Sequence, residues 1–120
     1  MQYFKNKTWI LGNFITFVKE KKDRSQNYNI DYYYDIYIPN DNNQLFPEMI
    51  VYVGNTVQIG EDDNEIYPVE VIKMNFDFGY SCDNFQDVID LATSQNPTVS
   101  ITKLIECLNY YNENDTFLDI

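Results

Sequence analysis

The stretch IDYYYDIYI, residues 30–38, carries a clear strand pattern, and Pro39 follows it directly. Its side chains alternate as they do in a strand whose two faces meet different surroundings. One face is apolar and consists of Ile30, Tyr32, Tyr34, Ile36 and Ile38; the other consists of Asp31, Tyr33, Asp35 and Tyr37. We therefore predict a strand with an apolar face toward the core and an Asp/Tyr face toward solvent. The alternative is that a helix covers the second face and that its tyrosines belong to the core.

Further strand patterns follow in the next forty residues. Residues 49–53 (MIVYV) form a nearly continuous apolar run, which is typical of a central strand covered on both sides. Residues 57–59 predict a short strand, and the acidic loop 60–65 (GEDDNE) predicts the tip of a hairpin. Apolar residues then alternate over residues 69–78, which predicts a long strand that ends at Gly79.

The first helix is predicted over residues 8–22. Its buried face consists of side chains at helical spacing: Ile10, Phe14, Phe17 and Val18. Thr8 is the expected N-cap. Four basic side chains follow and complement the negative end of the helix dipole: Lys19, Lys21, Lys22 and Arg24. We interpret them as a helix terminus rather than as a nucleic-acid patch.

Two more helices are predicted in the last third of the chain. The first covers residues 84–95, and Asp83 with Gln86 resembles a capping box at its start. The second begins after a proline and is capped by Ser100 or Thr98. Its apolar stripe consists of Ile101, Leu104, Ile105, Leu108 and Tyr111.

The order of these elements predicts the fold class. Strands that are grouped together, rather than alternating with helices, favour an antiparallel sheet with helices packed on it. We predict an α+β fold with an N-terminal helix, a three- to four-stranded mainly antiparallel sheet, and two C-terminal helices packed on the sheet. Residues 1–120 are expected to form a single domain. No stretch approaches the roughly 20 apolar residues that span a bilayer, and no signal-peptide pattern is found, so a cytoplasmic protein is expected.

Charge is distributed unevenly along the chain. Eight basic and nineteen acidic side chains give a formal net charge of −11. Residues 1–24 hold six basic and two acidic side chains, a net +4, whereas residues 25–120 hold two basic and seventeen acidic ones, a net −15. Such an acidic body repels nucleic acids and anionic membranes and attracts cationic partners. The alternative is that the charge serves solubility alone.

Residue types that carry common enzyme chemistry are scarce. The chain has no histidine, and its four glycines form no phosphate-binding loop. Cys82 and Cys107 match neither a metal site nor a redox motif; they could form a disulfide if they are close in space, but buried free thiols are favoured. We predict no catalytic residue, no cofactor and no metal site, and hence a protein that is not an enzyme. A hydrolase with two carboxylates is the alternative, and it requires a pocket where two acids converge.

The remaining features predict a surface for a basic protein. Tyrosine is frequent at binding hot spots, and carboxylates pair with lysine and arginine. The expected contacts are the outward strand face and the acidic loop: Asp31, Tyr33, Asp35, Tyr37, Glu61, Asp62, Asp63 and Glu65. Nucleases are cationic because they bind phosphates, so their inhibitors tend to carry the opposite charge. The pattern favours a stoichiometric inhibitor of such an enzyme.

The C-terminal third also resembles a known group of proteins. The segments NFQDVID (residues 84–90) and LIECLNYYNENDTF (residues 104–117) are similar to the ending of small uncharacterised bacterial domains. Some relatives of those domains look like immunity proteins of contact-dependent growth inhibition and related polymorphic toxin systems. The resemblance implies a bacterial immunity protein whose partner is a cognate toxin domain, such as a nuclease. The alternative is an acidic nucleic-acid mimic or regulatory adaptor that blocks a host DNA- or RNA-binding protein.

Overall fold

The computed structural model describes residues 3–25, 27, 29–40 and 44–119. Its centre is a four-stranded antiparallel sheet in the order β1-β3-β2-β6. The strands are β1 (Lys7–Ile10), β2 (Asp35–Pro39), β3 (Ile50–Gly54) and β6 (Phe76–Ser81). The apolar run at residues 49–53 thus forms a central strand, as predicted, since β3 pairs with β1 on one side and β2 on the other.

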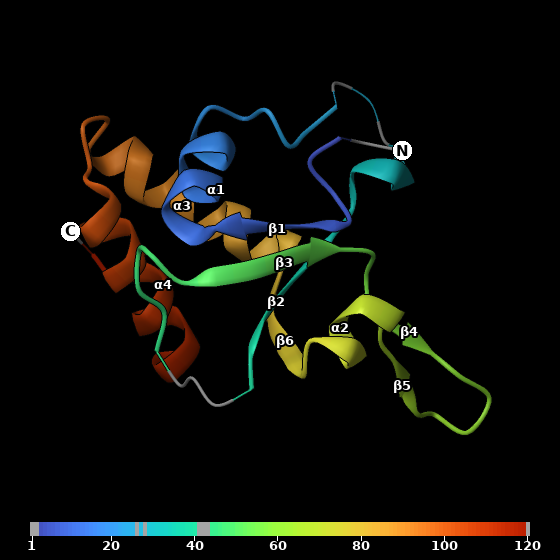
Figure 1. The fold of residues 1–120 in the computed structure, drawn as a ribbon. Coiled ribbons are helices and arrows are strands. Elements are labelled where there is room, and N and C mark those ends of the chain that lie inside the picture. The colour runs from blue at the N-terminus through green and yellow to red at the C-terminus, as the bar shows by residue number, and fades with distance from the viewer. Residues whose placement is uncertain (1–2, 26, 28, 41–43, 120) are drawn as a thin grey trace.

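Three helices cover one face of this sheet (Figure 1). They are α1 (Leu11–Lys19), α3 (Cys82–Gln95) and α4 (Ile101–Asn114). Each turns an apolar stripe inward, which buries a continuous core against β2 and β3. The largest fully buried side chains of this core include Phe4, Phe14, Tyr34, Ile36, Phe85, Leu104 and Leu108. The predicted α+β class, with an antiparallel sheet and two C-terminal helices, is confirmed.

The opposite face of the sheet is covered by a smaller group of elements. A hairpin of β4 (Gln58–Ile59) and β5 (Glu65–Ile66) leads into the short helix α2 (Val69–Lys73). Val71 of α2 packs against Tyr37 and Tyr52, which form a second, small apolar cluster on this face. The hairpin itself extends away from the body of the molecule (Figure 1). The predicted short strand and acidic hairpin tip are therefore confirmed.

The N-terminal helix begins later than predicted. Residues 7–10 form β1, an edge strand in which Thr8 pairs with Tyr52 and Trp9 with Val51, and α1 begins at Leu11. Thr8 is therefore not an N-cap; Ile10 occupies that position without a side-chain cap. Trp9 is partly buried and packs against the core. Over so few residues this apolar spacing suits a strand as well as a helix, and pairing with β3 decides between them.

Residues 69–78 are not one strand. Their first half forms α2, which ends where Asn75 adopts a left-handed conformation with φ 58°, and the second half begins β6. Gly79 lies inside β6 rather than at its end. The register between β2 and β6 shifts beside it, and a Cβ at this position would lie 2.9 Å from Cγ2 of Ile38. Glycine is required here by close packing, not by a strand terminus.

The predicted strand at residues 30–38 begins only at Asp35. Residues Ile30–Tyr32 form a 3-10 turn, η1, and the side chain of Asn29 accepts a hydrogen bond from the backbone nitrogen of Asp31 at 3.0 Å. This local hydrogen bond satisfies the backbone without a partner strand. The alternating pattern therefore corresponds to a strand only from Asp35 onward.

The C-terminal helices match their prediction apart from one cap. Ser100 caps α4 by accepting a hydrogen bond from the nitrogen of Lys103 at 3.1 Å. In α3 the cap is Ser81, so Asp83 is a first-turn residue and not part of a capping box. Cys82 and Cys107 are buried free thiols, as favoured from the sequence. Among the described residues, no helix has the length and apolar character needed to cross a membrane.

Candidate functional site

The hairpin and the elements after it concentrate negative charge on one side of the sheet. We call residues 57–78 the acidic lobe; it holds six acidic side chains and one lysine, a net −5. Backbone hydrogen bonds close the hairpin tip, from Gly60 nitrogen to Asn64 oxygen at 2.9 Å and from Asp63 nitrogen to Gly60 oxygen at 3.1 Å. Four predicted contact residues lie on this hairpin and all are exposed: Glu61, Asp62, Asp63 and Glu65.

Large aliphatic side chains are also exposed on the acidic lobe. Ile59, Ile66, Val69 and Ile72 are each more than half exposed. Exposed aliphatic groups beside polar ones are common at protein-binding surfaces. The hairpin pairs Ile59 with Glu65 and Ile66 with Gln58, so Ile59 and Ile66 lie on its two opposite faces. The lobe therefore offers apolar contact area together with charge, which the pattern of acids alone did not predict.

The other predicted contacts are not on one outward face. Tyr37 is fully buried and Asp35 is 7% exposed, because α2 and the segment before β4 cover the face of β2 on which they lie. The Asp35 carboxylate accepts a hydrogen bond from the Val57 nitrogen at 2.9 Å, and the Tyr37 hydroxyl donates one to the Asn55 oxygen at 2.7 Å. The expected outward Asp/Tyr face is thus wrong, and the alternative of a covered face is correct for these two residues.

These buried contacts give Asp35 and Tyr37 a positioning role. Both side chains hold the connection between β3 and β4, and so they fix the base of the hairpin to the sheet. Burial raises the pKa of Asp35, although the hydrogen bond from Val57 opposes this, and the charge of Asp83 adds to it. Burial, and then the nearby Asp35 charge, raises the pKa of Tyr37, which keeps its hydroxyl protonated as a donor.

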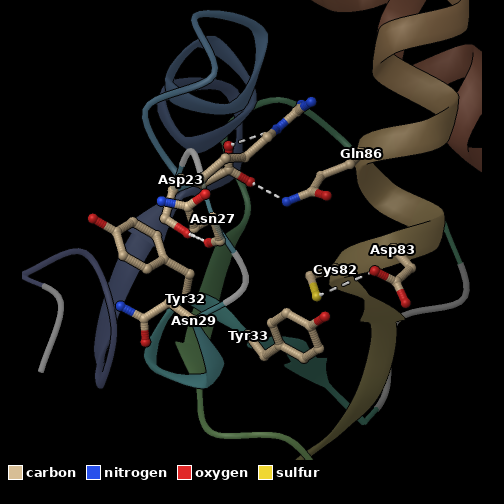
Figure 2. A pocket seen from close by; sticks show the side chains of 10 residues that line it. Asp23, Asn27, Asn29, Tyr32, Tyr33, Cys82, Asp83 and Gln86 are labelled. Carbon is tan, nitrogen blue, oxygen red and sulfur yellow. Dashed lines mark hydrogen bonds and ion pairs between the residues drawn. The ribbon is translucent and has the colours of Figure 1, made fainter.

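Asp31 and Tyr33 lie in a third place, at the opposite end of β2 from Pro39. Asp31 is exposed on η1, and its backbone oxygen accepts a hydrogen bond from the Lys5 ammonium group at 3.2 Å. Tyr33 is 41% exposed and lines a polar pocket of about 370 Å3, which Figure 2 shows. The structure therefore separates the eight predicted residues into a hairpin group, a buried pair and this pair.

A buried carboxylate that the sequence patterns did not single out forms one wall of the polar pocket. Asp23 is fully buried and accepts hydrogen bonds from the Tyr34 hydroxyl at 2.6 Å, from Gln86 at 2.7 Å and from Arg24 at 3.3 Å. Arg24 also binds both carboxylate oxygens of Asp90, at 2.7 and 2.9 Å. The network joins the end of α1 to β2 and α3. A buried acid has no signature in a single sequence, because its partners are distant along the chain.

One of the two acids that line this pocket is engaged in structural contacts. Asp83 also lines it, so two acids reach one pocket, but both oxygens of Asp23 already accept hydrogen bonds from the protein. Burial raises the pKa of the Cys82 thiol, which disfavours the thiolate that a nucleophile requires. In the part of the chain that the structure describes, no group of three or more acids or cysteines is placed to hold a metal ion.

One family model matches residues 16–120, a range that begins inside α1 and contains the acidic lobe and both C-terminal helices. The chain belongs to the DUF7716 family. That family is described as a domain of unknown function, so membership assigns no activity to the acidic lobe or to the polar pocket. Neither the curated proteins nor the solved structures include a match to the chain.

Proposed function

We propose that this chain is an immunity protein that binds a cognate basic toxin, of nuclease type, and neutralises it by covering its active site with the acidic lobe. The observation that carries the proposal is the hairpin with four exposed acids, flanked by exposed Ile59 and Ile66. Carboxylates on such a surface can occupy the positions where a nuclease binds phosphates. The aliphatic side chains supply the water-excluding contacts that charge alone does not provide.

The placement of the basic residues supports the same proposal. Six of the eight basic side chains precede Ser25, and α1, which carries Lys19, packs on the face of the sheet opposite the lobe. Lys73 is the one cation within the lobe, which keeps a net charge of −5. The negative field of such a lobe accelerates the approach of a positively charged partner by roughly 10- to 1,000-fold at low ionic strength.

The proposal predicts a toxin gene beside the gene for this chain, and co-expression with the product of that gene is the test. The wild-type chain is expected to restore growth and to co-purify with the toxin domain as a stoichiometric complex. Reversing two hairpin charges, with Glu61→Lys and Asp62→Lys, should slow association by roughly tenfold or more at low salt. The matched control reverses two exposed acids on other elements, Glu48→Lys and Asp87→Lys, and should slow it much less.

Two outcomes would count against the proposal. Equal effects of the hairpin pair and the control pair would show that net charge matters and that the lobe is not the contact surface. Capture of a host DNA- or RNA-binding protein in place of a toxin would instead support the nucleic-acid mimic or adaptor. Stopped-flow association at two salt concentrations separates steering from contact, because only steering weakens strongly with salt.

A further inference from the structure

Three kinds of surface meet in a hollow between the hairpin and α2. Its lining residues are Asn64, Glu65, Tyr67 and Ile72. Glu65 supplies a carboxylate, Tyr67 an aromatic ring and Ile72 an aliphatic wall that is more than half exposed. This is the set of groups that a long side chain with a cationic end requires, since such a side chain packs its stem on apolar surface and extends its charge to an anion.

Tyr67 is held in position from two directions. Its hydroxyl donates a hydrogen bond to the Asp77 carboxylate at 2.8 Å, and the same oxygen of Asp77 accepts one from the Phe78 nitrogen at 2.8 Å. Its ring centroid lies 5.8 Å from that of Tyr37, which is itself fully buried. The aromatic wall of the hollow is therefore ordered before any ligand arrives, which lowers the entropic cost of binding.

Charge around this ring favours a cation. The Asp77 carboxylate lies 2.8 Å from the Tyr67 hydroxyl, and Glu65 lines the same hollow as the Tyr67 ring. Partial burial, the hydrogen bond to Asp77 and the charges of Asp77 and Glu65 together raise the pKa of Tyr67 to about 12. Lys73, the one basic residue of the lobe, is not among the residues that line the hollow. The hollow therefore keeps its negative character.

We propose that this hollow receives an arginine side chain of the basic partner. The guanidinium group lies against the Tyr67 ring and pairs with Glu65, and its aliphatic stem packs on Ile72. Arginine suits the site better than lysine because a planar guanidinium both stacks on aromatic rings and forms paired hydrogen bonds with a carboxylate. The inference rests on the proposed function for its biological partner, but the recognition itself can be tested without the toxin.

The probe is N-acetyl-arginine-methylamide, titrated into the 15N-labelled full chain and followed by NMR. Saturable shifts are expected at the amides of Asn64, Glu65, Tyr67 and Ile72. The neutral isostere N-acetyl-citrulline-methylamide should produce no saturable shift, and the lysine analogue should bind more weakly. Glu65→Gln should weaken arginine binding by about 1.4- to fivefold, the range of an exposed ion pair.

Two further variants separate a local contact from general attraction. Asp62→Asn removes the same charge from the hairpin tip, outside the lining of the hollow, and should weaken binding less than Glu65→Gln does. Glu48→Gln, remote from the lobe, should leave the arginine affinity unchanged.

Any of three results would overturn the inference. The first is an equal loss of arginine affinity for Glu65→Gln and Asp62→Asn. The others are equal amide shifts with the arginine and citrulline probes, or no saturable shift with arginine. Such a result with toxin binding intact would reject the hollow as an arginine site and would leave the proposed function standing. Absence of any toxin complex, with arginine binding intact, would reject the proposed function alone.

Discussion

Replacing Tyr34 with phenylalanine removes one hydroxyl group and leaves the ring that fills the core. Tyr34 and Asp23 are both fully buried, and the distance between the hydroxyl and Oδ2 of Asp23 is 2.6 Å. The substitution creates no large cavity, so its effect reports the hydrogen bond to a buried carboxylate. Two other donors remain on Asp23 after the change, Gln86 at 2.7 Å and Arg24 at 3.3 Å.

The size of the effect follows from these contacts. A hydrogen bond to a charged group contributes about 1.5–3 kcal/mol, and the loss is smaller where other donors still solvate the acceptor. We therefore expect Tyr34→Phe to lower the free energy of unfolding by about 2 kcal/mol and the melting temperature by about 8 °C. Burial and the charge of Asp23 raise the pKa of Tyr34 well above its ordinary value. The hydroxyl thus stays protonated, and the loss should be constant between about pH 6 and pH 9.

Urea unfolding followed by the fluorescence of Trp9 and by far-UV circular dichroism measures this loss, with linear extrapolation to water. Tyr3→Phe is the matched control, because it deletes the same group from a ring that is 69% exposed, and it should change stability by less than about 0.5 kcal/mol. A loss for Tyr34→Phe no greater than that of the control would refute the argument that the buried network stabilises the junction of α1, β2 and α3.

Three further predictions concern single positions. Ser100→Ala removes the cap of α4 and should cost about 1 kcal/mol in urea unfolding, whereas Thr98→Ala, outside the cap, should cost less than about 0.5 kcal/mol. Gly79→Ala brings a methyl group to 2.9 Å from Ile38 and should lower stability by about 1–3 kcal/mol; an unchanged unfolding midpoint would contradict close packing at the register shift. Burial raises the pKa of Asp35 above 3.8, so the stability that this carboxyl contributes is complete below that value and is lost as the pH rises through the folded pKa. Asp35→Asn should therefore gain stability relative to the wild type as the pH rises from about 3.8 through the folded pKa of Asp35 in paired urea titrations, and a pH-independent difference would argue against a shifted carboxyl.

Local sequence patterns were sufficient to predict several elements of secondary structure. The apolar run at residues 49–53 predicted a central strand, and the acidic turn at 60–65 predicted a hairpin tip, because turn chemistry and short-range alternation act within a few residues. The helices near the C-terminus followed from their periodicity over fourteen residues each. Long amphipathic stretches leave little ambiguity about their secondary structure.

Short segments whose apolar spacing suits both a strand and a helix were predicted incorrectly. Residues 69–78 contain apolar positions that suit both a strand and a helix, and α2 forms because Val71 finds a buried partner in Tyr37 on the sheet. Asparagine often ends helices because it tolerates the left-handed conformation, which Asn75 adopts. Asn75 was therefore the one local signal for the boundary between α2 and β6. Residues 7–10 became a strand for a similar reason, since β3 offers them an edge to pair with.

The sequence by itself determined that the body is acidic, that the fold is α+β, and that a hairpin carries Glu61, Asp62, Asp63 and Glu65 into solvent. Only the tertiary structure decided that Asp35 and Tyr37 anchor this hairpin instead of facing a partner. The physical reason is that alternation along a strand separates its two faces but does not say what covers either one. That depends on α2, which lies more than thirty residues further along the chain and packs on the face of β2 that alternation alone placed in solvent.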